Sequence, residues 1–380
     1  MWAVIRGFEN QYDMFCQMRP MVVENVYHGV ILPVLPVENG PMWGLGGVCR
    51  EDGSFVELSA YDGGWATHGG GYPFAETAYE DCDVVYFGPF FRHWGHFLVD
   101  LLGRMWYIAR QGRMKVAYLG DEEPSGNFLE CFRLLGLEEE DLIRITEPTR
   151  FRNVVVPEFS CLSCRWYSRE YREIFDTMIQ NAEPQPIPGK KIYFSRLDFG
   201  RGKEVGETQI ACWAEANGFL SVAPENLTVS QQIAIWNGAE EILCLDGSIP
   251  ISAAFSRNES LRLTILHKTS LEHRNVELFL LMRPCRVTFL DAYREPFRGY
   301  PKNIGGGPFL LEIGEDILTY SKKQGMTLPY TPAQLAWIRF GNNFRLLWKI
   351  WNLPLKARLL LPQLLPAELK QKIREVLHRG

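Results

Sequence analysis

A histidine and an aspartate stand four residues apart in an otherwise apolar stretch, HWGHFLVDLLGRMW at residues 93–106. On an α-helix, positions i and i+4 lie one turn apart on the same face, so His96 and Asp100 could share a hydrogen bond or a substrate. Either side chain could then act as a general base toward a hydroxyl group. The alternative is structural, because buried polar groups normally have partners and Asp100 could simply satisfy His96.

A basic turn in the segment KKIYFSRLDFGRGKEVGE (190–207) offers a different chemistry. Ser195, Arg196, Arg201 and Lys203 follow a predicted strand, and an open α/β sheet binds its ligand at the carboxyl ends of its strands. Because a guanidinium group can bind two phosphate oxygens at once, this turn suits a diphosphate. It could also be a solvated basic turn.

A third candidate site is the end of the predicted strand in EEILCLDGSIPISAAF (240–255). Asp246, Gly247 and Ser248 lie where this strand gives way to a predicted helix. Glycine permits close approach of a ligand to the backbone, and the N–H groups at a helix start can bind phosphate or sugar hydroxyls. Upstream, Glu225 could accept hydrogen bonds from a ribose, or could be an ordinary surface residue beside a helix start.

The elements that must position these residues alternate between strands and helices after a Gly-, Pro- and aromatic-rich start of about 80 residues. Such alternation predicts βαβ units and a parallel sheet. The proline-rich stretch at 182–191 predicts a linker between two such series, with a ligand cleft between them. The predicted strands are 83–90, 114–120, 150–159, 191–196, 218–224, 240–247, 262–267 and 286–292. One predicted helix begins near residue 93, and the others span 126–137, 168–182, 207–218 and 228–239.

Composition restricts the class of protein. The 380 residues are 46% hydrophobic and 22% charged, which is typical of a folded chain, and the net charge of −5 argues against a dedicated nucleic-acid binder. There is no signal-peptide pattern and no apolar run long enough to cross a membrane, so we expect a cytoplasmic protein. Nine scattered cysteines are consistent with reduced thiols, and the CLSC pair at 161–164 lacks the partners of a zinc site.

Taken together, these segments resemble glycosyltransferase family 61. WGHFLVDLLGR is similar to the family's histidine-bearing helix, and FSRLDFGRGKEVGETQIACWAEANGF to its F-S-R block. ENLTVSQQ and LDGSIPISAAF correspond to the two blocks that follow, with D-G-S as in the family's bacterial branch. The chain departs from the pattern at Gly103, Gly206 and Gln231, where proline, asparagine and glutamate are common.

The resemblance implies a GT-B architecture of two Rossmann-like domains and an inverting transfer that needs no metal or other cofactor. It implies an N-terminal acceptor-side domain at 1–185, a nucleotide-sugar domain at 186–295, and a loop with a helical basic tail at 296–380. The co-substrate would be a nucleotide sugar, with UDP expected, and the acceptor a bacterial surface glycan such as capsule, O-antigen or lipooligosaccharide. The alternatives are a non-catalytic binder of glycans or nucleotide sugars on this fold, and an epimerase acting on the nucleotide sugar.

The resemblance also assigns roles. Asp100 is the expected base, with His96 orienting it or the acceptor, or serving as the base itself. The expected donor-binding residues are Ser195, Arg196, Arg201, Lys203, Glu225, Asp246, Gly247 and Ser248; the expected acceptor-binding residues are Arg92, His93 and Trp94. The D-x-D at residues 81–83 precedes a strand rather than following one, so no metal ligand is assigned.

The last fifty residues differ from the rest of the chain in their charge. Residues 331–380 hold nine Lys/Arg and two Asp/Glu, a charge of +7, which leaves −12 for the preceding 330 residues. Basic residues interleaved with tryptophans and leucines suit peripheral contact with an anionic membrane, on the inner face of the cytoplasmic membrane. The alternative is that part of this tail packs back on the domains.

Overall fold

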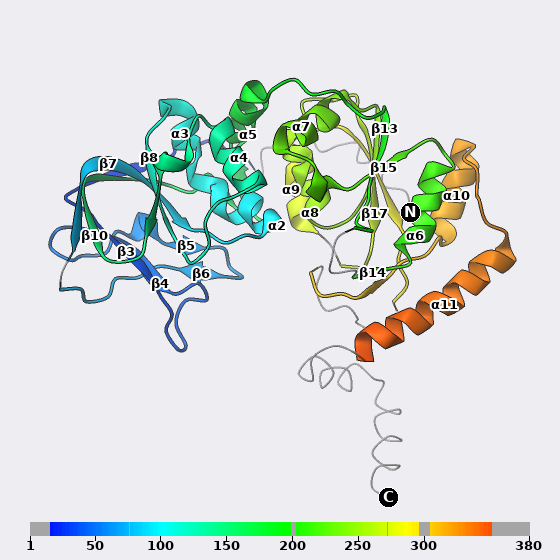
Figure 1. Cartoon of the computed structure of the whole chain (residues 1–380), viewed down its shortest axis with the longest axis horizontal. Coiled ribbons are helices and arrows are strands. Elements are labelled where there is room, and N and C mark those ends of the chain that lie inside the picture. Colours follow the sequence, from blue (N-terminus) through cyan, green and yellow to red (C-terminus); the bar gives the residue numbers. More distant parts are fainter. Residues whose placement is uncertain (1–15, 76, 199–202, 272, 296–304, 352–380) are drawn as a thin grey trace, which may run out of the picture.

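The computed structural model describes residues 16–75, 77–198, 203–271, 273–295 and 305–351. Two α/β halves lie side by side, each built around its own sheet (Figure 1). Helix α5 (Arg169–Asn181) ends the first half, and strand β13 (Lys191–Phe194) begins the second after the proline-containing loop. The chain is therefore a mixed α/β protein, as the alternating pattern predicted.

The sheet of the first half is mixed, which corrects the prediction of a parallel sheet. Strands β10, β7, β8 and β9 are parallel neighbours, but β2 and β3 run antiparallel to β10, and β4 runs antiparallel to β3. The Gly- and Pro-rich start of the chain supplies these added strands, and β9 is too short to show a clear pattern. The bounds are β1 Cys16–Gln17, β2 Val23–Tyr27, β3 Val30–Leu35, β4 Leu45–Cys49, β5 Tyr61–Asp62, β6 Thr67–His68, β7 Ala78–Pro89, β8 Lys115–Leu119, β9 Leu142–Ile145, β10 Thr149–Pro157, β11 Cys161–Leu162 and β12 Trp166–Ser168.

Alternate residues of β7 face two different cores, as strand geometry requires. Val84 and Tyr86 pack with residues of the antiparallel strands, whereas Val85 and Phe87 pack beneath the helices. Buried Arg104 links these layers by donating hydrogen bonds to the carbonyls of Pro157, Phe87, Leu58 and Ala60. The covering helices are α3 Trp106–Gln111, α4 Asn127–Leu134 and α5.

The second sheet is fully parallel, in the order β15-β13-β16-β17-β18. The strand order reverses between β13 and β16, and ligands of such sheets bind outside the carboxyl ends of the strands at this reversal. The strands are β15 Leu220–Val222, β16 Glu241–Leu245, β17 Arg262–His267 and β18 Arg286–Asp291; the helices are α6 Glu207–Glu215, α7 Val229–Gly238, α8 Ser248–Ile251, α9 Arg274–Met282 and α10 Glu315–Gln324. Thr228 and Gln231 form a capping box at the start of α7.

The two halves share one hydrophobic core. Phe132 and Phe175 of the first half belong to the same buried cluster as Trp236 and Phe255 of the second. Polar contacts also cross between the halves: the Glu130 carboxylate accepts hydrogen bonds of 2.8 Å from the first two backbone N–H groups of α7. The position of one half relative to the other is therefore held by apolar packing and by specific hydrogen bonds.

Part of the segment 296–380 packs on the second half. Strand β19 (Phe309–Leu310) pairs with β14 (Glu204–Val205), and helix α11 (Pro332–Trp351) lies across this pair. Of the helices that the structure describes, none is both long and apolar enough to cross a bilayer. The predicted tail beyond α11, residues 352–380, lies outside the described residues.

Candidate active site

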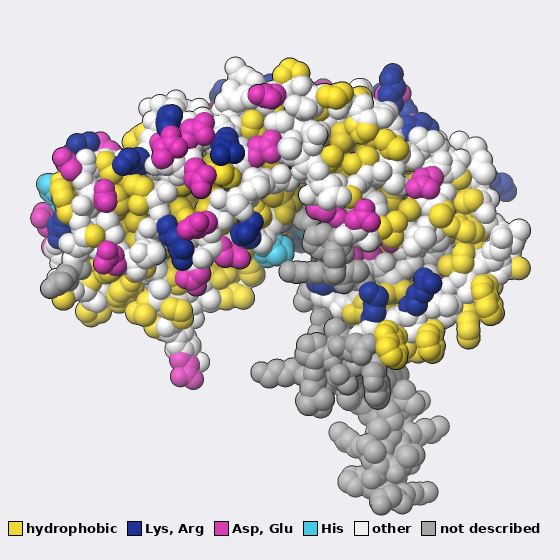
Figure 2. Space-filling model, viewed as in Figure 1, with side chains coloured by type: hydrophobic (Ala, Val, Ile, Leu, Met, Phe, Trp, Pro, Cys, Tyr) yellow, Lys and Arg dark blue, Asp and Glu magenta, His cyan; other side chains and the backbone are white. Residues whose placement is uncertain are grey.

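A cavity of about 830 Å³ lies between the halves, within the size range of ligand sites. Figure 2 shows the molecule hollowed there, with a histidine exposed on the side of the first half. The second half lines the cavity with the carboxyl ends of β13 and β16, at the reversal of strand order. Its lining includes Trp65, Arg92, His93, Trp94 and His96 of the first half and Arg196, Lys203, Glu204, Glu225, Gly247, Ser248, Lys268 and His273 of the second.

On the wall of the first half, His96 and Asp100 form a pair. His96 ends helix α2 (Trp94–His96), and its Nδ1 atom lies 2.8 Å from Oδ2 of Asp100. The His96 side chain is one-third exposed and lines the cavity, whereas the Asp100 carboxylate is fully buried. Asp100 therefore lies behind His96 and is not part of the lining of the cavity.

Three groups donate hydrogen bonds to the Asp100 carboxylate. Besides His96, they are the Tyr61 hydroxyl at 2.5 Å and the Trp65 indole N–H at 3.4 Å, both on Oδ1. Burial and the charge of Asp100 raise the pKa of Tyr61, so its hydroxyl keeps its proton and remains a donor. Because an ionised carboxylate only accepts, the proton shared with His96 belongs to Nδ1. The Nε2 atom of a neutral His96 ring then carries the lone pair.

The helix that carries this pair is irregular, unlike the predicted continuous helix. After α2 the chain makes a π-helical turn, η3 (Phe97–Leu101), and a 3₁₀ turn, η4 (Leu102–Arg104). A Cβ atom at Gly103 would lie 2.5 Å from the Phe159 ring, so the glycine leaves room for that ring. The contact between His96 and Asp100 forms within this irregular segment, and π turns of this kind are frequent at functional sites.

The opposite wall carries positive charge. Glu204 lies between two cations, 3.2 Å from the Arg196 guanidinium and 3.4 Å from the Lys268 ammonium, and all three side chains line the cavity. Burial lowers the pKa of Lys268, while the charge of Glu204 acts in the opposite direction. Lys203 also lines this wall, which therefore presents three cations together with the carboxylates of Glu204 and Glu225. Such a wall suits a diphosphate.

The turn after β13 is held from below by Glu207. This buried carboxylate accepts hydrogen bonds from the backbone N–H of Arg196 at 2.6 Å, from Tyr193 at 2.9 Å and from Ser195 at 3.3 Å. Burial raises the pKa of Glu207, and these donors act against that rise. Glu207 thus fixes the backbone from which the Arg196 side chain extends.

A second histidine–carboxylate pair lies on this wall. Asp246 Oδ1 accepts hydrogen bonds from His273 Nδ1 at 2.7 Å and from the Gly247 N–H at 2.6 Å. Burial alone would raise the pKa of Asp246, but the histidines His273 and His267 outweigh it and hold the pKa well below its ordinary value. Gly247 has φ +136°, and a Cβ atom there would lie 3.3 Å from the Lys268 Nζ atom. The glycine therefore supplies both the backbone conformation and the room for Lys268.

The structure brings most of the predicted residues to one place. The lining of the cavity includes His96, Arg92, His93, Trp94, Arg196, Lys203, Glu225, Gly247 and Ser248. Three predicted residues, Asp100, Ser195 and Asp246, are buried behind the lining. Arg201 lies outside the described residues. The predicted helix start after Gly247 is short, because α8 has four residues.

Sequence reasoning missed several lining residues. Lys268 and His273 follow β17 just as Arg196 follows β13, so the rule of strand carboxyl ends could have found them. Trp65 comes from the irregular N-terminal segment, as does Tyr61, which is buried outside the lining. No local pattern there indicates which side chains turn toward Asp100. His267 stacks on Phe289 with ring centroids 5.0 Å apart and does not line the cavity.

The D-x-D residues lie away from the cavity. Asp81 and Asp83 are in β7, and their carboxylates lie 3.5 and 2.8 Å from the Arg152 guanidinium. Among the described residues no group of three potential ligands could hold a metal ion. The described cysteines form no disulfide.

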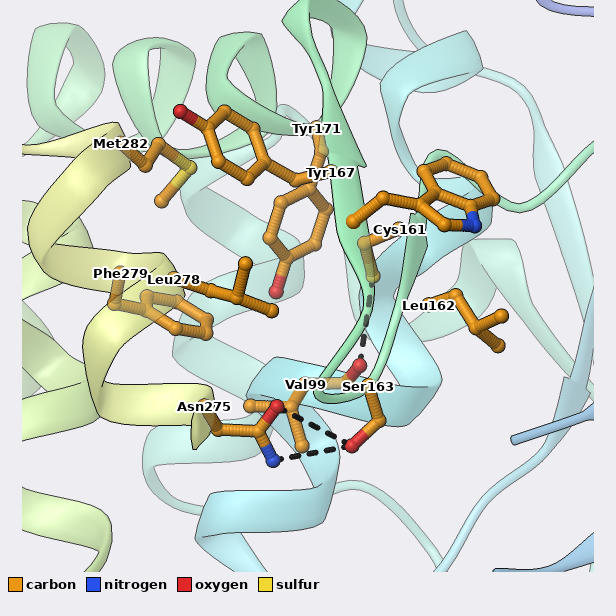
Figure 3. Close-up of a pocket in the computed structure, with 11 residues that line it drawn as sticks. Val99, Cys161, Leu162, Ser163, Tyr167, Tyr171, Asn275, Leu278, Phe279 and Met282 are labelled. Carbon is orange, nitrogen blue, oxygen red and sulfur yellow. Dashed lines mark hydrogen bonds between the residues drawn. The ribbon is translucent and has the colours of Figure 1, made fainter. Parts of the chain in front are cut away.

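A second cavity, beside the first, is too small for a substrate. It has room for about 10 Å³, roughly one water molecule, between β11, β12 and helix α9 (Figure 3). Figure 3 shows Leu278 and Phe279 facing Tyr167 across it, and Asn275 bonded to Ser163 at its lower edge, at 3.0 Å. The small cavity is thus part of the contact between the halves, and the large cavity is the candidate site.

The chain is similar to a known family over part of its length. Residues 94–262 match the family model described as Glycosyltransferase 61. The match begins at α2 beside His96 and extends past the turns after β13 and β16. No curated protein matches the chain.

Proposed function

The chain carries a glycosyltransferase family 61 domain over residues 94–262, and on this premise we propose that it transfers a sugar from a nucleotide sugar to a glycan acceptor with inversion and without a metal. The observation that carries the proposal is that one cavity has two facing walls with different chemistry. A histidine backed by a buried carboxylate faces a set of cations held on a second carboxylate. The first suits proton removal and the second suits a diphosphate leaving group.

His96 is the proposed base. Its Nε2 atom takes the proton of an acceptor hydroxyl while the hydroxyl oxygen attacks the anomeric carbon. The bond from that carbon to the diphosphate oxygen breaks, and a single displacement of this kind inverts the anomeric centre. Asp100 was the expected base from the sequence, but its carboxylate is buried and occupied by three donors, so its proposed role is to position His96 and stabilise the imidazolium.

The opposite wall is proposed to stabilise the negative charge that develops on the leaving group. Arg196, Lys203 and Lys268 are the proposed contacts of the diphosphate, and their charge can replace that of a metal ion. Ser248 offers a hydroxyl beside them, and exposed Glu225 is the proposed partner of the ribose. We expect a UDP-sugar as donor.

The acceptor is proposed to enter along the first wall. Arg92, His93, Trp94 and Trp65 lie there beside His96, and aromatic rings suit the apolar faces of sugars. The division into an acceptor-side domain, a donor domain and a C-terminal segment in a GT-B arrangement is part of this proposal. So is a bacterial surface glycan as acceptor, which rests on the D-G-S strand end.

A two-step experiment tests the function. Thermal shift with a panel of nucleotide sugars identifies the donor, because a ligand of the folded state raises Tm. Turnover of that donor is then followed with and without glycan acceptors. Transfer that depends on an acceptor and yields the opposite anomer supports the proposal. Donor binding without any turnover would favour the non-catalytic binder, and a changed nucleotide sugar without acceptor would favour the epimerase.

A further inference from the structure

Helix α11 presents two faces of different character. Asn342, Leu346 and Ile350, spaced four residues apart, are buried, and the latter two pack against Val205 and Leu310. Large apolar side chains cover the outer face of the helix: Trp337, Phe340, Phe344, Leu347 and Trp348. Their spacing of three to four residues places them along one stripe.

This aromatic stripe is exposed to an unusual degree. Each of its five side chains is 55–75% exposed, and Figure 2 shows hydrophobic side chains gathered along the edge of the molecule where α11 lies. Exposed hydrophobic residues scattered singly are ordinary, but a continuous patch on one helix indicates a surface that another body covers.

The distribution of charge along the chain indicates what kind of surface covers the stripe. Residues 331–380 carry +7 and the preceding 330 residues carry −12, so an anionic surface would attract the chain through this segment and repel the rest. Arg345 is exposed on α11 beside the stripe. Tryptophan with basic neighbours is the combination that favours the boundary between lipid headgroups and acyl chains. An anionic bilayer fits both properties, whereas a second copy docked through the same helix would offer the same positive charge.

The stripe also has a fixed relation to the cavity. Strands β14 and β19 form a two-stranded ribbon whose residues alternate between two sides. Glu204 and Phe309 line the cavity, while Val205 and Leu310 pack under α11. Among the described residues, this ribbon lies between the wall that carries the cations and the helix that carries the stripe.

We infer that the aromatic stripe of α11 docks the protein on the surface of an anionic phospholipid bilayer. The helix lies in the plane of the interface, with the aromatic rings among the headgroups and acyl chains and the basic side chains on anionic lipids. The attachment is peripheral and sensitive to salt. It places the cavity close to the membrane surface, where a lipid-linked acceptor would be reached.

Vesicle flotation of the full-length protein tests this inference. The vesicles are phosphatidylcholine with and without phosphatidylglycerol, at low and high salt. The test variant combines Trp337→Ser, Phe344→Ser and Trp348→Ser. The matched control combines Met18→Ser, Tyr27→Ser and Met42→Ser, three equally exposed apolar residues on the first half. We expect binding only to the anionic vesicles, lowered by salt, unchanged in the control and weakened roughly tenfold or more in the test variant.

Three results would overturn the inference: equal flotation of the test variant and the natural chain, binding that ignores lipid charge, or no binding at all. A concentration-dependent dimer that the test variant abolishes, without vesicle binding, would assign the stripe to a second copy. Donor binding is measured separately by the Tm shift with UDP. A missing UDP response alongside normal flotation would count against the proposed function and leave the docking surface standing.

Discussion

The two walls of the cavity carry the same histidine–aspartate pair in different surroundings. Each has a histidine whose Nδ1 contacts a buried aspartate, His96 with Asp100 at 2.8 Å and His273 with Asp246 at 2.7 Å, and both histidines line the cavity. Their neighbours differ. His96 stacks on Trp65, with ring centroids 4.6 Å apart, whereas Lys268 and Arg196 line the wall that carries His273.

This difference suggests a division of labour. Among aromatic rings, a histidine backed by a carboxylate can take a proton, and the ion pair that results is shielded from water. His273 lies 2.7 Å from Asp246 on the wall that also carries Lys268 and Arg196, so that histidine is suited to donating a hydrogen bond or holding Asp246 in place. Under the proposed function, the same local pair serves a base on one wall and anion binding on the other.

The largest expected effect comes from His96→Ala. Loss of the base should lower turnover by about two to four orders of magnitude, because the acceptor hydroxyl then has no proton acceptor. UDP affinity, measured by calorimetry, should stay unchanged since the cations lie on the other wall. Near-normal turnover in this variant would remove His96 from the chemistry and contradict the proposed difference between the two walls.

Asp100→Asn should have the next largest effect, a loss of roughly ten- to a hundredfold in kcat, as is common for a residue that orients a functional histidine. If the amide nitrogen faces His96, the ring must carry its proton on Nε2, where it can no longer act as a base. KM for the donor should not move. A marked fall in Tm that accompanies the loss of activity would instead indicate a purely structural carboxylate.

Arg196→Ala tests the opposite wall. Removing one charge-assisted hydrogen bond should weaken UDP binding by about 1.5 to 3 kcal/mol. The control is Arg286→Ala, which removes an exposed arginine at the amino end of β18, away from the cavity. Calorimetry that gives both variants the affinity of the natural chain would make the basic turn an ordinary solvated surface.

His273→Gln makes the comparison sharper because it changes the second histidine alone. Glutamine can still donate a hydrogen bond toward Asp246, so we expect UDP affinity to fall by less than about tenfold, the scale of one neutral hydrogen bond. Turnover at saturating donor should stay close to normal. A collapse of kcat with intact UDP binding would mean that the bases had been assigned to the wrong wall.

The smallest expected effect is that of a chelator. If Arg196, Lys203 and Lys268 neutralise the charge of the leaving group, activity in the presence of EDTA should be unchanged within the error of the assay. Full loss of activity that manganese restores would show that the positive wall is not sufficient by itself.

Local patterns in the sequence determined the elements and the positions of three site segments. Alternating apolar runs and capping residues predicted most strands and helices, and the turns after β13 and β16 were located because strand ends are visible in the sequence. The pairing of His96 with Asp100 was likewise predictable from a spacing of four residues. These features depend on neighbours in the chain, which a single sequence displays directly.

Only the tertiary structure decided which of these groups reaches the cavity. Asp100 became a buried partner rather than an exposed base because Tyr61 and Trp65, more than thirty residues away in an irregular segment, turn their donors toward it. Lys268 joined Arg196 through Glu204 because three separate chain segments converge at the strand reversal. The mixed first sheet and the outward stripe of α11 have the same origin: pairing between distant segments sets which face of an element is covered, and no local period encodes that choice.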